Sequence, residues 1–239
     1  MENKYPQKPG LDFILKQAFF YWNKTLVFQL MFSIMYFGIL MTVFFFCDAK
    51  YDILNGYVEV AKYAKDGVQV YTEQLRKLLL TENFQNFSLW MTGTHIFLYP
   101  LNLGFYQIYR KMDLGEQVGV GDLFVGYNGF NFFKYIGYYI FWYFIFAYSA
   151  QTIILGIVWV GITMFVAPMM FFMNKSIFQS IALHFQVFKI FFVEIIVCMI
   201  VAVLFKYIGF ILIIGGLFTF PFWNAMIYSL YKVIFSEKN

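Results

Sequence analysis

Residues 135–174 read YIGYYIFWYFIFAYSAQTIILGIVWVGITMFVAPMMFFMN, forty residues without Asp, Glu, Lys, Arg or His. As a helix this stretch would be about 60 Å long, which is twice the hydrocarbon thickness of a bilayer. Its most polar patch, Ser149-Ala150-Gln151-Thr152, lies near the middle. We therefore expect a helical hairpin that crosses a membrane twice and turns near this patch. The alternative is a hairpin buried in a large soluble protein, and the charge-free segments on both sides argue against it.

The composition of the whole chain agrees with a membrane protein. Hydrophobic residues make up 62% of the 239 residues and charged residues only 13%, about half the usual share in soluble domains. Arginine occurs only at positions 76 and 110, which argues against a dedicated nucleic-acid or phosphate reader. Cys47 and Cys198 lie in or beside apolar segments, so we interpret them as small apolar side chains rather than a disulfide or a metal pair.

The remaining apolar segments predict further membrane crossings. We expect an all-α, polytopic membrane protein with a single transmembrane domain over residues 1–239. The first ten residues are polar and contain two prolines, which predicts a flexible tail. They do not form a signal peptide, because the first apolar run begins only after Lys24 and is too long for one. The six expected spans are residues 25–47, 84–109, 131–149, 152–173, 190–206 and 207–231.

Three polar segments have the periodicity of amphipathic helices. Residues 12–24 and 174–189 predict helices at the membrane interface, with Asp12 and Ser176 as N-terminal caps. Residues 48–83 carry apolar side chains every three or four positions and predict an external amphipathic segment, broken at Gly67. This external segment could dock a partner or pack on the protein's own helix ends.

A pattern of polar residues and prolines recurs three times. A polar residue opens an amphipathic stretch and a lysine closes it 12 or 13 positions later, at 12–24, 122–134 and 176–189. The chain has five prolines, and three of them fall inside even-numbered spans at equivalent places. We infer three pseudo-repeated hairpins, each with an interfacial helix, and we expect kinked helices at Pro100, Pro168 and Pro221.

The distribution of lysine and arginine predicts the orientation in the membrane. With six spans, both termini lie on the same side. That side holds most of the basic residues, whereas six acidic residues balance the five basic ones of the external segment. We therefore place both termini in the cytoplasm and the external segment on the other side. The basic residues on the cytoplasmic side are Lys4, Lys8, Lys16, Lys24, Arg110, Lys111, Lys134, Lys175, Lys189, Lys232 and Lys238.

The connection after the second span carries a loose motif. It runs from Leu103-Gly104 through Arg110 to Gly115-Glu116-x-Val118-x-x-Gly121-Asp122-Leu123-Phe124-x-Gly126-Tyr127, and Ala167-Pro168 and Pro221-Phe222 follow later. Over residues 85–235 the chain resembles bacterial six-span integral membrane families of unknown function. These families are similar to the membrane part of membrane-anchored glycerophosphodiester phosphodiesterases. The resemblance implies a multi-pass protein of the bacterial inner membrane. The families offer no established catalytic residues to carry over, and we expect no catalytic barrel in this chain.

Glu194 and His95 lie well inside predicted spans, and His184 lies near the interface; ionisable residues inside a membrane are functional candidates by default. Glu194 in the fifth span could couple to protons or cations, or it could form a structural hydrogen bond or an ion pair with Lys189. His95 could bind a ligand, satisfy a carbonyl freed by Pro100, or lie at the outer interface. The aromatic run at residues 138–144 could line a groove for a lipid or another hydrophobic ligand, or it could face the surrounding lipid.

These observations predict a protein that acts without catalysis. No motif for a catalytic nucleophile or a zinc site occurs in the sequence, so we expect no enzyme, no metal and no cofactor. The first functional hypothesis is an accessory or scaffold subunit of a larger inner-membrane complex, with membrane lipids and other integral membrane proteins as partners. The alternative is a transporter or lipid-handling protein whose proline-kinked spans form a cavity near Glu194.

Overall fold

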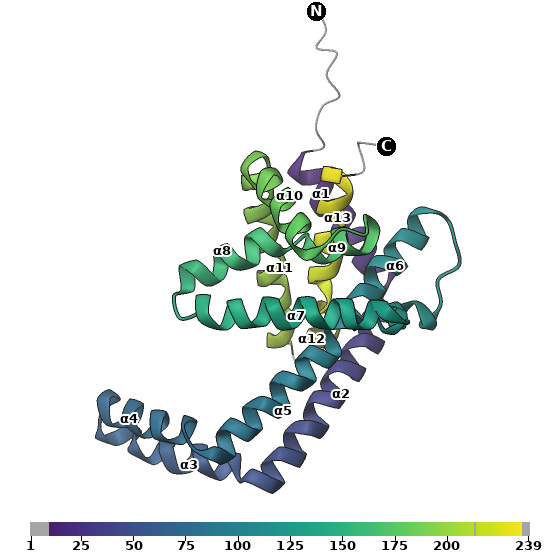
Figure 1. The fold of residues 1–239 in the computed structure, drawn as a ribbon. Helices are drawn as coiled ribbons and strands as arrows, with labels where there is room; N and C mark the ends of the chain where they lie inside the picture. Colours follow the sequence, from purple (N-terminus) through teal and green to yellow (C-terminus); the bar gives the residue numbers. More distant parts are fainter. Residues whose placement is uncertain (1–9, 213, 236–239) are drawn as a thin grey trace, which may run out of the picture. The chain divides into compact units, whose positions relative to one another are not determined.

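The computed structural model describes residues 10–212 and 214–235, and the regular structure of these residues is helical throughout (Figure 1). This confirms the predicted all-α class. Nine of the ten residues of the predicted N-terminal tail lie outside the described residues, and Lys4 and Lys8 are among them. Lys238 also lies outside the described residues.

Three helical stretches are long and apolar enough to cross a membrane, as a membrane protein requires: Leu26–Tyr51, Ile153–Phe172 and Phe192–Ile211. They correspond, with small shifts at their ends, to three of the six predicted spans: 25–47, 152–173 and 190–206. The other predicted spans are also helical, but two are interrupted at prolines. The third, at 131–149, is rich in tyrosine and contains Lys134, which lowers its mean hydropathy. The number of crossings stays a prediction.

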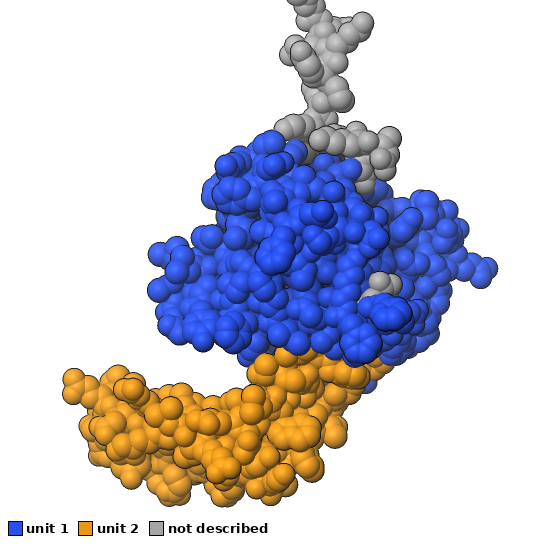
Figure 2. Space-filling view, viewed as in Figure 1, with its two compact units in different colours: residues 1–34, 99–239 blue, residues 35–98 orange. Residues whose placement is uncertain are grey.

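The chain divides into two compact units, coloured separately in Figure 2. Unit 1 comprises residues 1–34 and 99–239, and unit 2 comprises residues 35–98. Helix α2 (Leu26–Tyr51) contributes to both. The other helices of unit 1 are α1 (Leu11–Lys24), η2 (Tyr99–Leu101), α6 (Asn102–Asp113), η3 (Val120–Tyr127), α7 (Phe130–Ser149), α8 (Ile153–Thr163), α9 (Val166–Phe172), α10 (Ile177–Ile190), α11 (Phe192–Ile211), α12 (Gly215–Thr219) and α13 (Phe222–Phe235).

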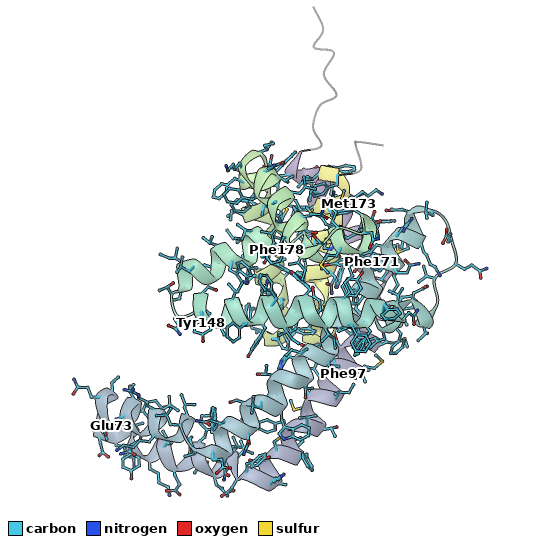
Figure 3. The ribbon with its side chains drawn as sticks, viewed as in Figure 1. Glu73, Phe97, Tyr148, Phe171, Met173 and Phe178 are labelled. Carbon is cyan, nitrogen blue, oxygen red and sulfur yellow. The ribbon has the colours of Figure 1, made fainter. Side chains whose placement is uncertain are left out.

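The central hairpin forms as predicted. Helices α7 and α8 are joined by a turn at residues 150–152, within the polar patch (Figures 1 and 3, where Tyr148 is labelled near the turn). The indole N–H of Trp142 donates to Thr163 Oγ1 at 2.8 Å, and that of Trp159 donates to the carbonyl of Trp142 at 3.2 Å. These bonds between the helices stabilise the hairpin, because few other groups satisfy polar atoms in an apolar setting.

Helices form in the segments 12–24 and 174–189 as predicted, and one predicted cap is wrong. Ser176 caps α10 and forms a capping box with Gln179. Helix α1, however, begins after Gly10, and Asp12 lies in its first turn, where it pairs with Lys16 at 2.8 Å. The acidic side chain still favours the helix start through the helix dipole.

The middle member of the threefold pattern is not a single helix. Residues 120–127 form the 3₁₀ helix η3, and α7 begins only at Phe130. Gly129 lies between them with φ +59°, a left-handed conformation that ends one helix before the next begins. The pattern of Asp122 and Lys134 therefore spans a turn instead of an interfacial helix.

Two glycines of the loop motif hold η3 against the preceding helix. A Cβ atom on Gly104 would lie 2.4 Å from the Cα of Leu123, and one on Gly126 would lie 2.3 Å from the carbonyl oxygen of Pro100. No side chain fits at such distances, so α6, η2 and η3 pack backbone to backbone. The ion pair between Lys111 of α6 and Asp122 of η3, at 2.8 Å, also joins these two segments.

Unit 2 contains the rest of α2, α3 (Ile53–Lys62), η1 (Tyr63–Asp66), α4 (Val68–Leu79) and α5 (Glu82–Leu98). Gly67 breaks the external segment with φ +104°, as predicted. Helix α4 buries none of its residues, and Glu73 on this helix, labelled in Figure 3, pairs with Lys77 at 2.8 Å. The external segment thus remains largely exposed within its own unit.

Candidate functional site

A cavity of about 320 Å³ lies within unit 1. We call it the proline cavity, because residues within two positions of each of the three in-span prolines line it. Its aromatic residues are Tyr99, Tyr106, Tyr138, Tyr139, Trp142 and Trp223. Its polar residues are Asn102, Thr163, Lys206 and Asn224, and its aliphatic ones are Val160, Met164, Ala167 and Ile227.

The prolines explain why polar groups meet in this cavity. Pro100 lies in η2 and Pro221 lies between α12 and α13, whereas Pro168 lies in the first turn of α9, just after the break from α8. Proline lacks the backbone donor and leaves a carbonyl of the preceding turn without its helical partner. Polar side chains near such breaks can satisfy the freed groups.

Two asparagines connect two of these breaks. The amide nitrogen of Asn102 donates to the carbonyl of Tyr99 at 3.0 Å. The amide nitrogen of Asn224 donates to Oδ1 of Asn102 at 3.0 Å. Asn224 is buried, with 3% of its surface exposed. The amide pair therefore joins the segment after Pro100 to the segment after Pro221 at the wall of the cavity.

Stacked aromatic rings form another wall. The rings of Tyr99 and Tyr139 are 4.2 Å apart and nearly parallel, and those of Tyr139 and Trp142 are 5.7 Å apart. Within the aromatic run at 138–144, Tyr138, Tyr139 and Trp142 line the cavity, whereas other members such as Phe144 are exposed. One face of α7 therefore lines the cavity, and another face is exposed.

Lys206 is the charged residue of the cavity. Helix α11 continues past the predicted end of its span, residue 206, to Ile211, so Lys206 lies inside the helix and not at its end. Its ammonium lies 4.5 Å from the centre of the Phe220 ring, a favourable cation–π distance. Sequence reasoning missed this residue, although Glu194 and Lys206 are the only charged residues between positions 190 and 231.

The structure does not bring the predicted site residues to the cavity. Glu194 lies half-buried in the first turn of α11, where the helix dipole favours an acidic side chain. Among the described residues it forms no ion pair, and Lys189 instead lies 4.6 Å from the Phe185 ring. His95, in unit 2, is bonded to the carbonyl of Met91 at 2.8 Å, one turn earlier in α5.

His184 is a buried histidine with a structural role. The backbone N–H of Phe165, at the break between α8 and α9, donates to Nδ1 of His184 at 3.2 Å. The two rings stack at 4.7 Å. Helix α10 lies outside the three candidate spans, and burial lowers the pKa of His184 from 6.5 to about 3. The imidazole is therefore neutral and accepts the hydrogen bond that the broken helix leaves open.

This lowered pKa predicts acid sensitivity. The unfolded chain binds a proton on His184 below pH 6.5, whereas the folded chain does not until near pH 3, so stability falls as the pH falls through this range. Between pH 6.5 and pH 5 we expect a loss of about 2 kcal/mol from this residue. Thermal unfolding in detergent at both pH values measures it. His184→Gln should remove this part of the pH dependence, while His95→Gln should retain it; equal slopes in both variants would contradict the assignment.

A second polar cluster connects α1, α6 and α13 through hydrogen bonds and an ion pair. The sequence analysis did not predict this cluster. The hydroxyls of Tyr21 and Tyr228 donate to the two oxygens of Asp113, each at 2.7 Å. Lys232 pairs with Asp113 at 2.8 Å. Burial and then the bond to Asp113 raise the pKa of Tyr21 well above its usual range, so it remains a donor at neutral pH. Every member has partners, so the cluster is structural.

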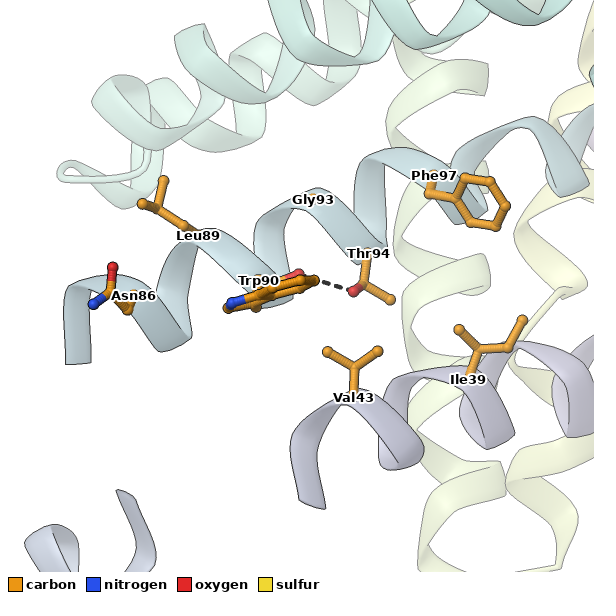
Figure 4. A pocket seen from close by; sticks show the side chains of 8 residues that line it. All are labelled: Ile39, Val43, Asn86, Leu89, Trp90, Gly93, Thr94 and Phe97. Atoms are coloured by element: carbon orange, nitrogen blue, oxygen red, sulfur yellow. Dashed lines mark hydrogen bonds between the residues drawn. The ribbon is translucent and has the colours of Figure 1, made fainter. Parts of the chain in front are cut away.

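Unit 2 has a separate groove of about 470 Å³ between α2 and α5 (Figure 4). Its walls include Leu89, Trp90 and Phe97, which are about half exposed or more. The hydroxyl of Thr94 donates to the carbonyl of Trp90 within the same helix, at 2.8 Å. The groove therefore offers apolar surface but few converging polar groups, which is typical of a lipid-facing surface and not of a specific site.

The fold and the proline cavity define a class: an all-helical protein with helices long and apolar enough to cross a membrane and a small aromatic cavity near helix breaks. Within the described residues, no group of three potential metal ligands lies together. Comparisons with protein-family models, with curated proteins and with solved structures find no match.

Proposed function

We propose that this protein is a non-catalytic, multi-pass membrane protein that binds a small amphipathic molecule in the proline cavity, as a transporter or lipid-handling protein does. The observation that carries the proposal is the meeting of three helix breaks at one cavity with aromatic walls and a few polar groups. Small-molecule sites have this composition, and several transporter folds bind substrates at interrupted helices. We place the binding site in the proline cavity and not near Glu194, because Glu194 does not line the cavity.

The proposal includes six crossings in the inner membrane of a bacterium, arranged as three pseudo-repeated hairpins with both termini cytoplasmic. The three apolar spans and the proline break in each even-numbered predicted span support it. We also retain the relationship to six-span families similar to the membrane part of membrane-anchored phosphodiesterases. Two glycines of that motif, Gly104 and Gly126, lie where a larger residue would clash with the backbone of a neighbouring segment. This close packing is a physical reason for glycine at both positions of the motif. Membrane lipids are the partners that this topology implies.

A bound molecule should survive purification in a mild detergent. Val160 lines the cavity, whereas Val158 on the same helix is 46% exposed. Phenylalanine at position 160 would fill part of the cavity, so we expect Val160→Phe to reduce the bound molecule about tenfold, as measured by native mass spectrometry. Val158→Phe adds the same volume outside the cavity and should leave occupancy unchanged. A wild-type protein that carries no molecule, or equal loss in both variants, would refute the proposal.

The second candidate function is an accessory or scaffold subunit. It is favoured by the exposure of the external segment: α4 buries no residue, and Val58 on α3 and Val68 on α4 are 56% and 82% exposed. The same purification at native expression tests it. A stoichiometric protein partner, lost when Val58 and Val68 are changed to lysine, would support a subunit role; a protein that runs alone would oppose it.

A further inference from the structure

We propose that the molecule in the proline cavity has an anionic oxygen head group, a carboxylate or a phosphate, on a single apolar chain. This inference rests on the proposed function and adds the charge and the size of the ligand. It is carried by Lys206, by the donors that line the same cavity, and by the volume of the cavity.

The residues that line the cavity carry a positive charge and no negative charge. Lys206 contributes an ammonium, and no Asp or Glu is among the lining residues. Of the ion pairs within residues 10–212 and 214–235, none includes Lys206. A cation in an apolar helix bundle is costly unless it is paired or reaches water. An anionic ligand would supply the missing charge, and an ammonium binds either carboxylate or phosphate as a point charge.

Neutral donors lie in the same lining. Asn224 uses one of its two amide N–H groups for the bond to Asn102, which leaves the second for a ligand. Tyr106 is buried with 3% exposure, and its hydroxyl makes no hydrogen bond within the part of the chain that the structure describes. Hydrogen bonds from such donors to an anion are about twice as strong as bonds between neutral groups. The cavity is therefore better equipped for an oxyanion than for an alcohol or a cation.

The size and the walls restrict the rest of the ligand. A volume of about 320 Å³ is at the small end of ligand sites, which span roughly 300–1,000 Å³. That size favours one apolar chain over the two chains of a membrane phospholipid. The stacked rings of Tyr139 and Trp142 offer flat apolar surface for it.

Photolabelling of the purified protein tests this inference. The probe is palmitate with a diazirine in its chain, and unlabelled palmitate, hexadecyl phosphate, hexadecanol and hexadecyltrimethylammonium compete with it. We expect the two anions to compete at least about tenfold better than the alcohol and the cation. Whichever anion competes better distinguishes a carboxylate ligand from a phosphate one. Lys206→Met should reduce palmitate labelling about tenfold, and Lys206→Arg should restore the preference for anions.

The outcomes separate this inference from the proposed function. If the alcohol competes as well as palmitate, or if Lys206→Met labels like wild type, the ammonium only reaches toward the membrane surface, and the anionic ligand is refuted while the cavity remains a site. If a diazirine hexadecanol probe and the palmitate probe both fail to label the cavity in wild type, the proposed function falls as well. The competition series uses wild-type protein, so it decides the question even if Lys206→Met does not fold.

Discussion

Gly126→Ala should prevent unit 1 from reaching its native packing. A Cβ atom at this position would lie 2.3 Å from the carbonyl oxygen of Pro100, and both groups belong to backbone that cannot rotate away. The 3₁₀ helix η3 would have to move away from η2, and the backbone at Pro100 would lose its packing against Gly126. Overpacking of this kind costs about 3 kcal/mol or more. Gly104→Ala, with a Cβ 2.4 Å from the Cα of Leu123, should have a similar effect.

Thiol reactivity measures this effect. Cys198 is fully buried in unit 1, so in a Cys47→Ala background a fluorescent maleimide reports the unfolding of this unit alone. We expect either glycine variant to lower the unfolding temperature by several degrees or to expose Cys198 at once. Gly121→Ala is the matched control, because a Cβ there would meet nothing within 4 Å. A Gly126→Ala protein as stable as Gly121→Ala would show that the loop does not pack against Pro100.

Asp113→Asn should have the second largest effect. Asp113 accepts hydrogen bonds from Tyr21 and Tyr228 and pairs with Lys232. An amide of the same size would turn one acceptor into a donor that faces a donor, and Lys232 would lose its counter-charge. Hydrogen bonds to a charged group contribute about 1.5–3 kcal/mol each, so we expect a loss of about 3 kcal/mol.

The same thiol assay measures this loss against an exposed aspartate. Asp12→Asn removes an ion pair with Lys16 in which both side chains are more than three-quarters exposed, and such pairs contribute little. Asp113→Asn should therefore unfold at a clearly lower temperature than Asp12→Asn. Similar temperatures for the two variants would mean that the cluster does not hold α1, α6 and α13 together.

The local features of the fold could be predicted because single residues decide them. The turn at 150–152, the cap at Ser176 and the break at Gly67 each follow from the backbone chemistry of those residues. The end of α11 could not be predicted, because a lysine such as Lys206 normally marks the end of an apolar span, and its cavity and the Phe220 ring are known only from the structure. The 3₁₀ segment at 120–127 depends on backbone packing that no periodicity reveals.

The site was predicted only in part, for a similar reason. The prolines and the aromatic run were identified from sequence, but their meeting in one cavity depends on how segments far apart in the chain pack. Glu194 was identified because a carboxylate in an apolar span is conspicuous, yet its place in the first turn of α11 gives it a favourable setting without a ligand. Asn102 and Asn224 are ordinary residues until the helix breaks bring them together at 3.0 Å.

The position of the photolabel tests most directly whether the ligand binds in the proline cavity. Wild-type protein labelled with diazirine palmitate is digested, and the modified peptides are mapped by mass spectrometry. We expect label on the segments around Trp142 and Trp223, which line the cavity, and its loss in Val160→Phe. Label confined to the α2–α5 groove of unit 2, around Trp90 and Phe97, would contradict it.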